Sequence, residues 1–394
     1  MTGNPLQFPK GFYWGCATSA HQVEGSNTNN DWWQAEQKGT VRYKSGRACD
    51  SYNRYEEDFD LAQAMHNNAH RFSIEWSRIE PEEGKFSEEA IEHYRKVIRA
   101  LKARGMEPFV TLHHFTNPIW FAQKGGWLHK DAAEYFARYA EYVATQLKDD
   151  VRYWITINEP NVYAGDGFLT GKFPPHRRNM FAGWQVRARM LDAHCKAAER
   201  LRRIKREFHI GIAYNVSSFE AAGKGPVRLA NIFFVWCLQY VGTGAPLKKI
   251  APYTDFIGIN YYRHFLITFG RLEEKGAGRS DSGWALYPPG IYNVVMEVKK
   301  YGKPIFITEN GLADAHDAQR PAFIREHLQW LHKAIEEGAD VRGYFHWSLL
   351  DNFEWAEGFS KRFGLVEVNF DTMERRMRES GRVYGEICKN NGLS

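Results

Sequence analysis

Eight short runs of β-branched and aromatic residues alternate with amphipathic stretches along the chain, and this alternation constrains the fold more than any other feature. Apolar runs that alternate with helices are typical of a parallel sheet covered on both faces. We expect strands at residues 12–17, 70–74, 108–113, 153–157, 210–214, 255–259, 304–308 and 342–347. We expect helices at residues 52–67, 87–104, 131–148, 183–206, 290–301 and 320–338.

Eight strand–helix units favour a closed barrel. The runs lie roughly 40 to 60 residues apart, which leaves room in each unit for a strand, a helix and two loops. We therefore expect residues 1–394 to form a single (β/α)8 domain, a TIM barrel. An open doubly wound sheet is the competing architecture, but no G-x-G-x-x-G sequence or phosphate-binding loop follows any run. No linker divides the chain, and residues 271–283 are predicted to be a surface loop near the functional site.

Composition argues against several classes of partner. The formal net charge is only +5, from 52 Lys and Arg against 47 Asp and Glu, so we expect no nucleic acid partner. The one basic run, residues 200–206, is assigned to the solvated face of a helix. No stretch approaches the roughly 18 apolar residues of a membrane span, and the first residues lack the apolar core of a signal peptide. We therefore expect no membrane partner and a cytoplasmic location, where the five scattered cysteines would be reduced.

Polar residues gather where the expected strands end. Catalytic groups of such barrels cluster at these carboxyl ends. A single polar residue there is as well explained by a helix cap or a satisfied core group. Several polar residues at one rim of the barrel favour a polar ligand, because each buried polar group left unpaired costs about 1 to 3 kcal/mol. The residues are Gln22, Arg71, His113, His114, Asn158, Glu159, Asn260, Tyr261, Tyr262, Glu309, Asn310 and Trp347.

Two of these residues, Glu159 and Glu309, follow the fourth and seventh expected strands and would face each other across the barrel mouth. One carboxylic acid can protonate a leaving oxygen while the opposite carboxylate attacks the anomeric carbon of a sugar. The two groups then need unequal environments, which Arg71 and Tyr262 would supply by holding Glu309 ionised. The alternatives are structural ion pairs and, for Glu159 before Pro160, a role at a helix start.

Adjacent histidines raise the possibility of a metal site. Neighbouring strand residues point to opposite faces, so His113 and His114 cannot readily share one ion, and no H-E-x-x-H spacing occurs. We predict no metal and no cofactor. His114 is expected to bind substrate hydroxyls, and His113 to be a packing residue.

The chain resembles the family 1 glycoside hydrolases, the β-glucosidase and β-galactosidase family, from Phe8 nearly to its last residue. The matching segments are FPKGFYWGCATSAHQVEG at 8–25, RFSIEWSRIEP at 71–81, TLHHFTNP at 111–118, ITINEP at 155–160, DFIGINYY at 255–262, ITENGLAD at 307–314 and HWSLLDNFEWAEGFSKRFGLVEV at 346–368. The resemblance implies that Glu159 is the acid/base and Glu309 the nucleophile, supported by Arg71 and Tyr262. It also implies a substrate-binding set: Gln22, His114, Asn158, Asn260, Trp284, Trp347, Glu354, Trp355 and Phe363. Of these, Trp347 would form the platform beneath the sugar and Trp284 would line the aglycone entrance, although either could be an ordinary packing residue.

Two residues narrow the class that the resemblance implies. Members that act on 6-phosphosugars carry Ser in place of Glu354, whose carboxylate would repel phosphate, so Glu354 implies an unphosphorylated sugar. Myrosinase-like members carry Gln in place of Glu159, so Glu159 argues against that activity.

The chain also departs from the family pattern. The usual Trp after His114 is Phe115 here, which removes a hydrogen-bond donor to the sugar. The chain is also short for the family, with the shortfall around residues 221–252, and shorter loops would leave the aglycone side more open.

These features predict a retaining, exo-acting β-glycosidase that takes unphosphorylated small-molecule glycosides or oligosaccharides. A β-glucosidase is favoured over a β-galactosidase or β-fucosidase. Two alternatives remain. A transglycosylase would use the same covalent intermediate with a sugar acceptor in place of water, and a non-catalytic carbohydrate-binding barrel would bind sugar without turnover.

Overall fold

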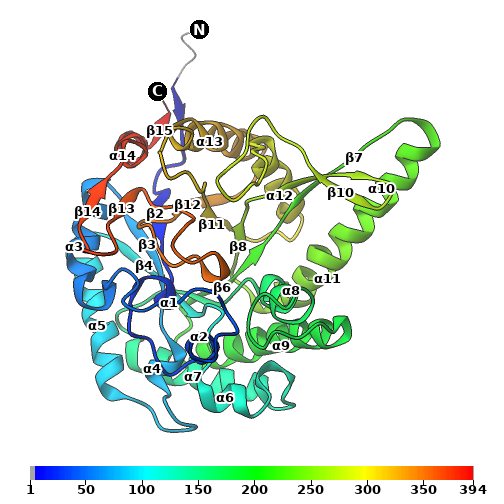
Figure 1. Ribbon diagram of the computed structural model, residues 1–394. Coiled ribbons are helices and arrows are strands. Elements are labelled where there is room, and N and C mark those ends of the chain that lie inside the picture. Colours follow the sequence, from blue (N-terminus) through cyan, green and yellow to red (C-terminus); the bar gives the residue numbers. More distant parts are fainter. Residues whose placement is uncertain (1–4, 394) are drawn as a thin grey trace.

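The computed structural model describes residues 5–393 and is built around a closed barrel of eight parallel strands (Figure 1). All eight expected strands are confirmed as barrel strands, with ends that shift by at most two residues. Around the barrel the order is β11-β12-β2-β3-β4-β5-β6-β8. The strands are β2 (Tyr13–Ala17), β3 (Ala69–Ser73), β4 (Glu107–His113), β5 (Tyr153–Asn158), β6 (His209–Asn215), β8 (Phe256–Asn260), β11 (Ile305–Asn310) and β12 (Val341–Trp347).

The six expected helices are also confirmed, and they surround the barrel (Figure 1). They are α3 (Ser51–Ala64), α5 (Glu88–Ala103), α7 (Ala132–Leu147), α9 (Met180–Ile204), α12 (Pro289–Lys299) and α13 (Arg320–Glu336). The Ser87 side chain caps α5 by accepting a hydrogen bond from the backbone of Ala90. Helix α5 buries Ile91, Tyr94 and Ile98 at helical spacing, which turns one apolar face onto the barrel.

Shorter elements fill the loops and the ends of the chain. Helix α14 (Glu379–Asn390), which the sequence analysis did not predict, packs against α13. Strand β1 (Leu6–Gln7) pairs with β15 (Gly392–Leu393), so the two ends of the described chain lie together. Strands β13 (Val366–Val368) and β14 (Arg375–Met377) form a second antiparallel pair. The short helices are α1 (Ala20–Val23), α2 (Asp31–Lys38), α4 (Trp76–Ile79), α6 (Ile119–Gln123), α8 (Pro160–Phe168) and α11 (Ala245–Ile250).

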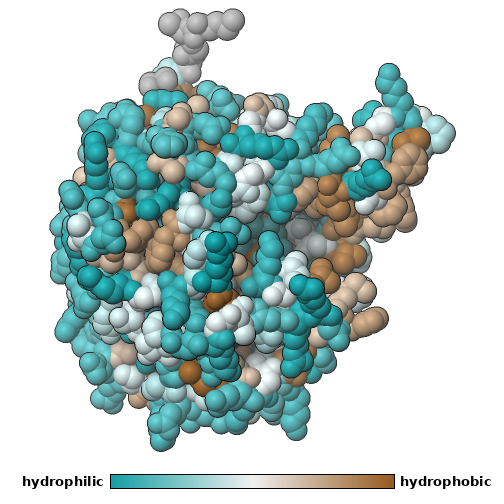
Figure 2. Space-filling model, in the orientation of Figure 1, coloured by the Kyte–Doolittle hydropathy of each residue, from teal (hydrophilic) through white to brown (hydrophobic). Residues whose placement is uncertain are grey.

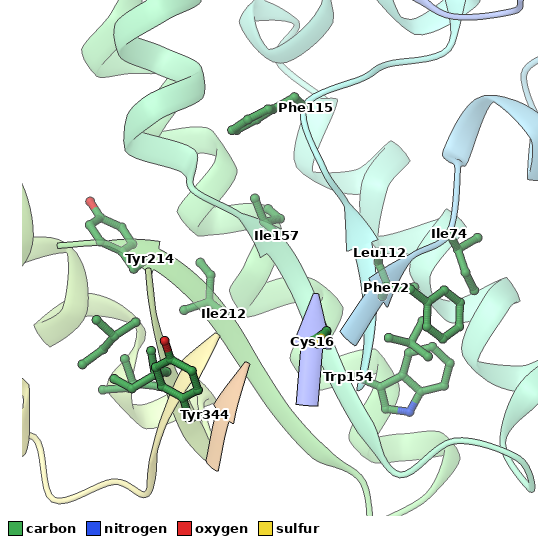
Figure 3. Close-up of a cluster of buried hydrophobic side chains, with 14 of the residues drawn as sticks. Cys16, Phe72, Ile74, Leu112, Phe115, Trp154, Ile157, Ile212, Tyr214 and Tyr344 are labelled. Atoms are coloured by element: carbon green, nitrogen blue, oxygen red, sulfur yellow. The ribbon is translucent and has the colours of Figure 1, made fainter. Parts of the chain in front are cut away.

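The apolar core has two layers because side chains alternate between the two faces of each strand. One layer lies between strands and helices, and Figure 3 shows Phe72, Leu112 and Trp154 of this layer side by side. The other layer fills the barrel with large aromatic rings set against very small residues. At Gly211 a Cβ atom would lie 2.4 Å from the Phe256 ring, so only glycine fits there. The packed interior closes the barrel below the strand ends.

A three-stranded sheet and one helix project from the barrel between β6 and β8 and beyond β8 (Figure 1). We call this unit the arm. It consists of β7 (Ser218–Ala221), α10 (Gly225–Gln239), β9 (His264–Thr268) and β10 (Arg271–Glu274), in the strand order β10-β9-β7. The expectation of a loop at 271–283 is therefore wrong for its first four residues. They pair with β9 across a two-residue turn whose residues, Phe269 (φ 43°) and Gly270 (φ 72°), both have positive φ.

Candidate active site

A cleft of about 490 Å³ opens at the carboxyl ends of the barrel strands. Ten of the thirteen predicted site residues line it: Gln22, His114, Glu159, Tyr262, Trp284, Glu309, Trp347, Glu354, Trp355 and Phe363. The other three, Arg71, Asn158 and Asn260, are fully buried next to these residues. The structure therefore brings the whole predicted set together in one place.

Glu309 on β11 contacts a cation and a phenol. Arg71 Nη1 on β3 donates to Glu309 Oε1 at 2.5 Å, and Tyr262 Oη, just after β8, donates to Glu309 Oε2 at 2.8 Å. Burial raises the pKa of Glu309 above its ordinary value, while the Arg71 charge and the hydrogen bonds from Arg71 and Tyr262 act against that rise. Two charge-assisted contacts thus favour the carboxylate form.

Glu159 follows β5 and has only neutral hydrogen-bond donors. The side-chain amides of Asn215 and Asn260 each donate to Glu159 Oε1 at 2.9 Å. Burial raises the pKa of Glu159 to about 8, and the negative charge of Glu309 adds to the rise. Its backbone lies in the left-handed region at φ 45°, a conformation that costs free energy for a residue with a side chain. Glu159 stands at the cap position of α8 but makes no capping hydrogen bond, so its carboxyl is turned to the cleft instead.

A buried polar layer beneath the cleft fixes both glutamates. Arg71 Nη2 donates to Asn158 Oδ1 at 2.6 Å, and Asn260 Nδ2 donates to the same oxygen at 3.1 Å. The Thr308 hydroxyl donates to Asn260 Oδ1 at 2.6 Å, which directs the Asn260 NH₂ group toward Glu159. Asn158 Nδ2 lies 3.2 Å from His114 Nε2. Arg71 thereby links the surroundings of Glu309 to those of His114 and Glu159.

The cleft also has an aromatic wall and a third carboxyl. Trp347 at the end of β12 stacks on His114 with ring centroids 5.9 Å apart, and the Trp355 ring stacks on the same histidine at 6.2 Å. Gln22 Nε2 lies 3.3 Å from Glu354 Oε2. Burial and the charge of Glu309 raise the pKa of Glu354 to about 8.

Gly311 sets the position of Trp347. A Cβ atom on Gly311 would lie 1.7 Å from the Trp347 carbonyl oxygen, so β11 and β12 can approach this closely only with glycine there. The glycine of the Glu309-Asn310-Gly311 sequence is therefore required by packing against the aromatic wall.

The two adjacent histidines point to different surroundings. His113 packs edge-on against Trp127, and its Nε2 lies 3.1 Å from Asn117 Oδ1, away from the cleft. His114 lines the cleft. Burial lowers the pKa of both imidazoles, that of His113 to about 4. Among residues 5–393, no three His, Cys, Asp or Glu side chains gather closely enough to hold a metal ion.

Several cleft residues were absent from the sequence prediction. Asn215 is the last residue of β6, and the strand-end rule would have identified it had it been applied to the fifth barrel strand. Ser217 and Arg263 lie two and three residues after the ends of β6 and β8. The others lie further from a strand end: Val162, Gly165, Asp166, Thr170, Lys172, Phe173, Ser282, Ala356, Glu357 and Lys361. Phe115 also lines the cleft and has a positive φ of 74°.

Comparison with known proteins identifies the family of the chain. Residues 4–231 and 243–393 match the model of glycosyl hydrolase family 1. The chain is 34% identical to β-glucosidase A of Thermotoga maritima, and the match covers 99% of both chains. It is 32% identical to a β-galactosidase of Pyrococcus woesei, and that match covers 98% of both chains. A solved β-glycosidase structure from Pyrococcus horikoshii is 42% identical, with a TM-score of 0.91 over 99% of this chain and 96% of that one. The chain therefore belongs to glycosyl hydrolase family 1, and it is a glycoside hydrolase of the β-glycosidase type.

Proposed function

We propose that the chain is a retaining, exo-acting β-glucosidase that hydrolyses unphosphorylated β-glucosides, with Glu309 as nucleophile and Glu159 as acid/base. The observation that carries the proposal is the difference between the two carboxyls. Glu309 receives a guanidinium and a phenol donor, whereas Glu159 receives two neutral amides and has a pKa raised to about 8. One group is thus prepared to attack and the other to donate a proton at the same pH.

The reaction follows from these protonation states. The Glu159 carboxylic acid protonates the glycosidic oxygen while a Glu309 oxygen attacks the anomeric carbon, and the bond to the leaving group breaks. Glu159 then accepts a proton from water, which attacks the glycosyl–Glu309 ester and releases the sugar with its original configuration. The Asn260 amide bonds Glu159 and lowers the pKa of Glu309 as well, which supports a short separation between the carboxyls, as a retaining enzyme needs.

The sugar would be held on the side of the cleft opposite the arm. Trp347 supplies an apolar platform for the pyranose ring, and Gln22, His114 and Glu354 supply hydrogen-bonding groups for its hydroxyls. Glu354 stands where members that act on 6-phosphosugars resemble this chain but carry Ser, and its presence favours an unphosphorylated sugar. The name of the Thermotoga relative favours glucose, while that of the Pyrococcus woesei relative keeps galactosides among the expected substrates.

We further propose a cytoplasmic location, since all five cysteines are free and three of them are buried.

On the aglycone side we propose an open cleft. Comparable rates on short and long oligosaccharides would support an open cleft, whereas a strict preference for small aryl aglycones would contradict it.

The test is a screen of nitrophenyl α- and β-glycosides combined with trapping by a 2-deoxy-2-fluoro glucoside. We expect turnover of the β-glucoside with retention, and a trapped sugar on the peptide that contains Glu309. Product analysis at high acceptor concentration separates hydrolysis from transglycosylation. Sugar binding without turnover of any nitrophenyl β-glycoside would instead indicate a non-catalytic carbohydrate-binding barrel, and a label on Glu159 would refute the assignment of roles.

A further inference from the structure

The outer face of the arm is an exposed apolar surface. Helix α10 buries only one residue, Asn231, although its sequence is mostly apolar. Phe233 is 63% exposed and Trp236 is 56% exposed. We call the following exposed residues the apolar patch: Leu229, Ile232, Phe233, Phe234, Trp236, Tyr240 and Val241, with Phe269 and Leu272 of the β9–β10 hairpin. Contiguous apolar surface of this kind marks an interaction site.

The orientation of α10 is fixed from the buried side. Asn231 Nδ2 donates to the carbonyl of Ala222 at 3.0 Å, and Asn231 Oδ1 accepts from the backbone N–H of Phe269 at 2.9 Å. The helix is therefore tied to both the β7 end and the hairpin turn by its one buried polar side chain. Its apolar residues are left on the outside, where Figure 2 shows a hydrophobic surface on the projecting arm.

The patch is continuous along the helix and carries large aromatic rings. The Phe233 and Trp236 rings stack with centroids 6.0 Å apart, and the Trp236 and Tyr240 rings stack at 5.5 Å. Residues 232–242 lie between the two segments that match the family model. The part of the patch on α10 and the turn after it thus falls almost entirely outside what this chain shares with that model.

The charged residues on the α10 side of the apolar patch are basic, whereas on the hairpin side Arg271 and Lys275 accompany Glu273 and Glu274. From Ala221 to Thr254 the sequence contains no Asp or Glu, and its only charged residues are Lys224, Arg228, Lys248 and Lys249. All four are exposed, although Lys249 pairs with Asp192 of α9. Lys224 and Arg228 therefore place two basic residues at the start of the apolar helix, and Lys248 and Lys249 follow in α11.

We propose that the arm binds the surface of a lipid bilayer that carries anionic headgroups, with the apolar patch resting in the interface. Trp and Tyr are the side chains that favour the headgroup level, and nearby basic residues are attracted to anionic lipid. A second copy of the chain is a weaker candidate, because a symmetric contact would bring the basic residues of both copies into one interface. Within the described residues no helix has both the length and the apolar character to cross a membrane, so the arm would lie on the bilayer.

This proposal departs from the expectation of no membrane partner, which weighed membrane-spanning segments, a signal peptide and the basic run at 200–206 but not an exposed apolar helix. It also stands apart from the proposed function, since no residue of the apolar patch lines the cleft.

The test is co-sedimentation of the full-length chain with vesicles of phosphatidylcholine, alone or with roughly one third phosphatidylglycerol. We expect binding to the anionic vesicles that weakens at high salt. The triple variant Phe233→Ser, Phe234→Ser and Trp236→Ser should lower the partition coefficient at least roughly tenfold, because it removes much of the apolar surface. The matched triple variant with Leu at the same positions keeps that surface apolar and should retain most of the binding.

Several results would overturn the proposal. They are a wild-type chain that does not sediment with anionic vesicles, equal binding to both vesicle types, or undiminished binding of the serine variant. A wild-type dimer that the serine variant converts to a monomer would instead assign the patch to a second copy. Unchanged thermal unfolding midpoints of both variants show that any loss of binding does not come from misfolding.

Discussion

Asn215 at the end of β6 donates a hydrogen bond of 2.9 Å to Glu159, the carboxyl that we propose as acid/base. This bond lowers the pKa of Glu159, against the larger effect of burial that raises it to about 8. Asn215→Ala should therefore raise the Glu159 pKa further. The carboxyl would stay protonated to higher pH, so the alkaline limb of the kcat/KM profile should move to higher pH.

A cleft residue two positions further on provides the control. Ser217→Ala removes a hydroxyl from the same part of the cleft and should leave the alkaline limb in place. An alkaline limb that does not move in Asn215→Ala would show that Glu159 is not the group titrating there.

The two glutamates should give different mutant phenotypes. Glu309→Gly removes the proposed nucleophile and should lower kcat on every substrate by roughly 10⁴-fold or more. Glu159→Ala should retain turnover of dinitrophenyl glucosides, whose leaving groups need no proton, and azide should restore its activity by forming the glycosyl azide. Steady-state rates with and without azide check both variants, and exchanged phenotypes would reverse the roles.

Tyr262→Phe tests the phenol contact to Glu309. A hydrogen bond to a charged group contributes about 1.5 to 3 kcal/mol, so kcat/KM should fall roughly 10- to 100-fold. Tyr261→Phe is the matched control, because the Tyr261 hydroxyl donates to the Tyr287 carbonyl instead and does not line the cleft. We expect Tyr261→Phe to lower the unfolding midpoint slightly and to leave kcat/KM nearly unchanged. Equal losses of activity in the two variants would mean that the Glu309 contact has no special importance.

Glu354 should destabilise the fold as the pH rises. Its folded-state pKa of about 8 lies above the unfolded value, so the neutral form is favoured in the fold. The stability associated with this group is fully present below the unfolded pKa and is lost as the pH rises through the folded pKa. The glutamine in Glu354→Gln cannot ionise, so this variant does not lose that stability. The melting temperature of the variant minus that of the wild type should therefore be larger at pH 8 than at pH 5 by a few degrees. Thermal unfolding at the two pH values measures this, and a difference that does not change with pH would contradict the raised pKa.

The barrel was predictable because its signals are local and repeated. Each strand is a short run of β-branched and aromatic residues, and each predicted helix has an apolar face. The site was predictable for a geometric reason, since all strand ends of a parallel barrel lie at one rim. Glu159 and Glu309 could therefore be placed together although they are far apart in sequence.

The arm was not predictable by the same means. Helix α10 is apolar on nearly every side, so its residues have no periodic pattern that separates a buried face from an exposed one. The hairpin turn at Phe269-Gly270 lacks the Asn-Gly or Asp-Gly sequence that usually marks such turns. Strand β10, with the sequence Arg271-Leu-Glu-Glu, has only one apolar residue. These features follow from tertiary contacts, such as the two hydrogen bonds of Asn231, that the sequence does not display.

The attachment points of the arm have a consequence for how the enzyme can diversify. Strand β7 begins three residues after Asn215 and β9 begins two residues after Tyr262, so each end of the arm joins the barrel beside a residue that bonds one of the two glutamates. Ser217 and Arg263 at these junctions line the cleft. Changes in the arm can therefore alter which leaving groups are accepted, while the strands that hold the glutamates and Trp347 remain as they are.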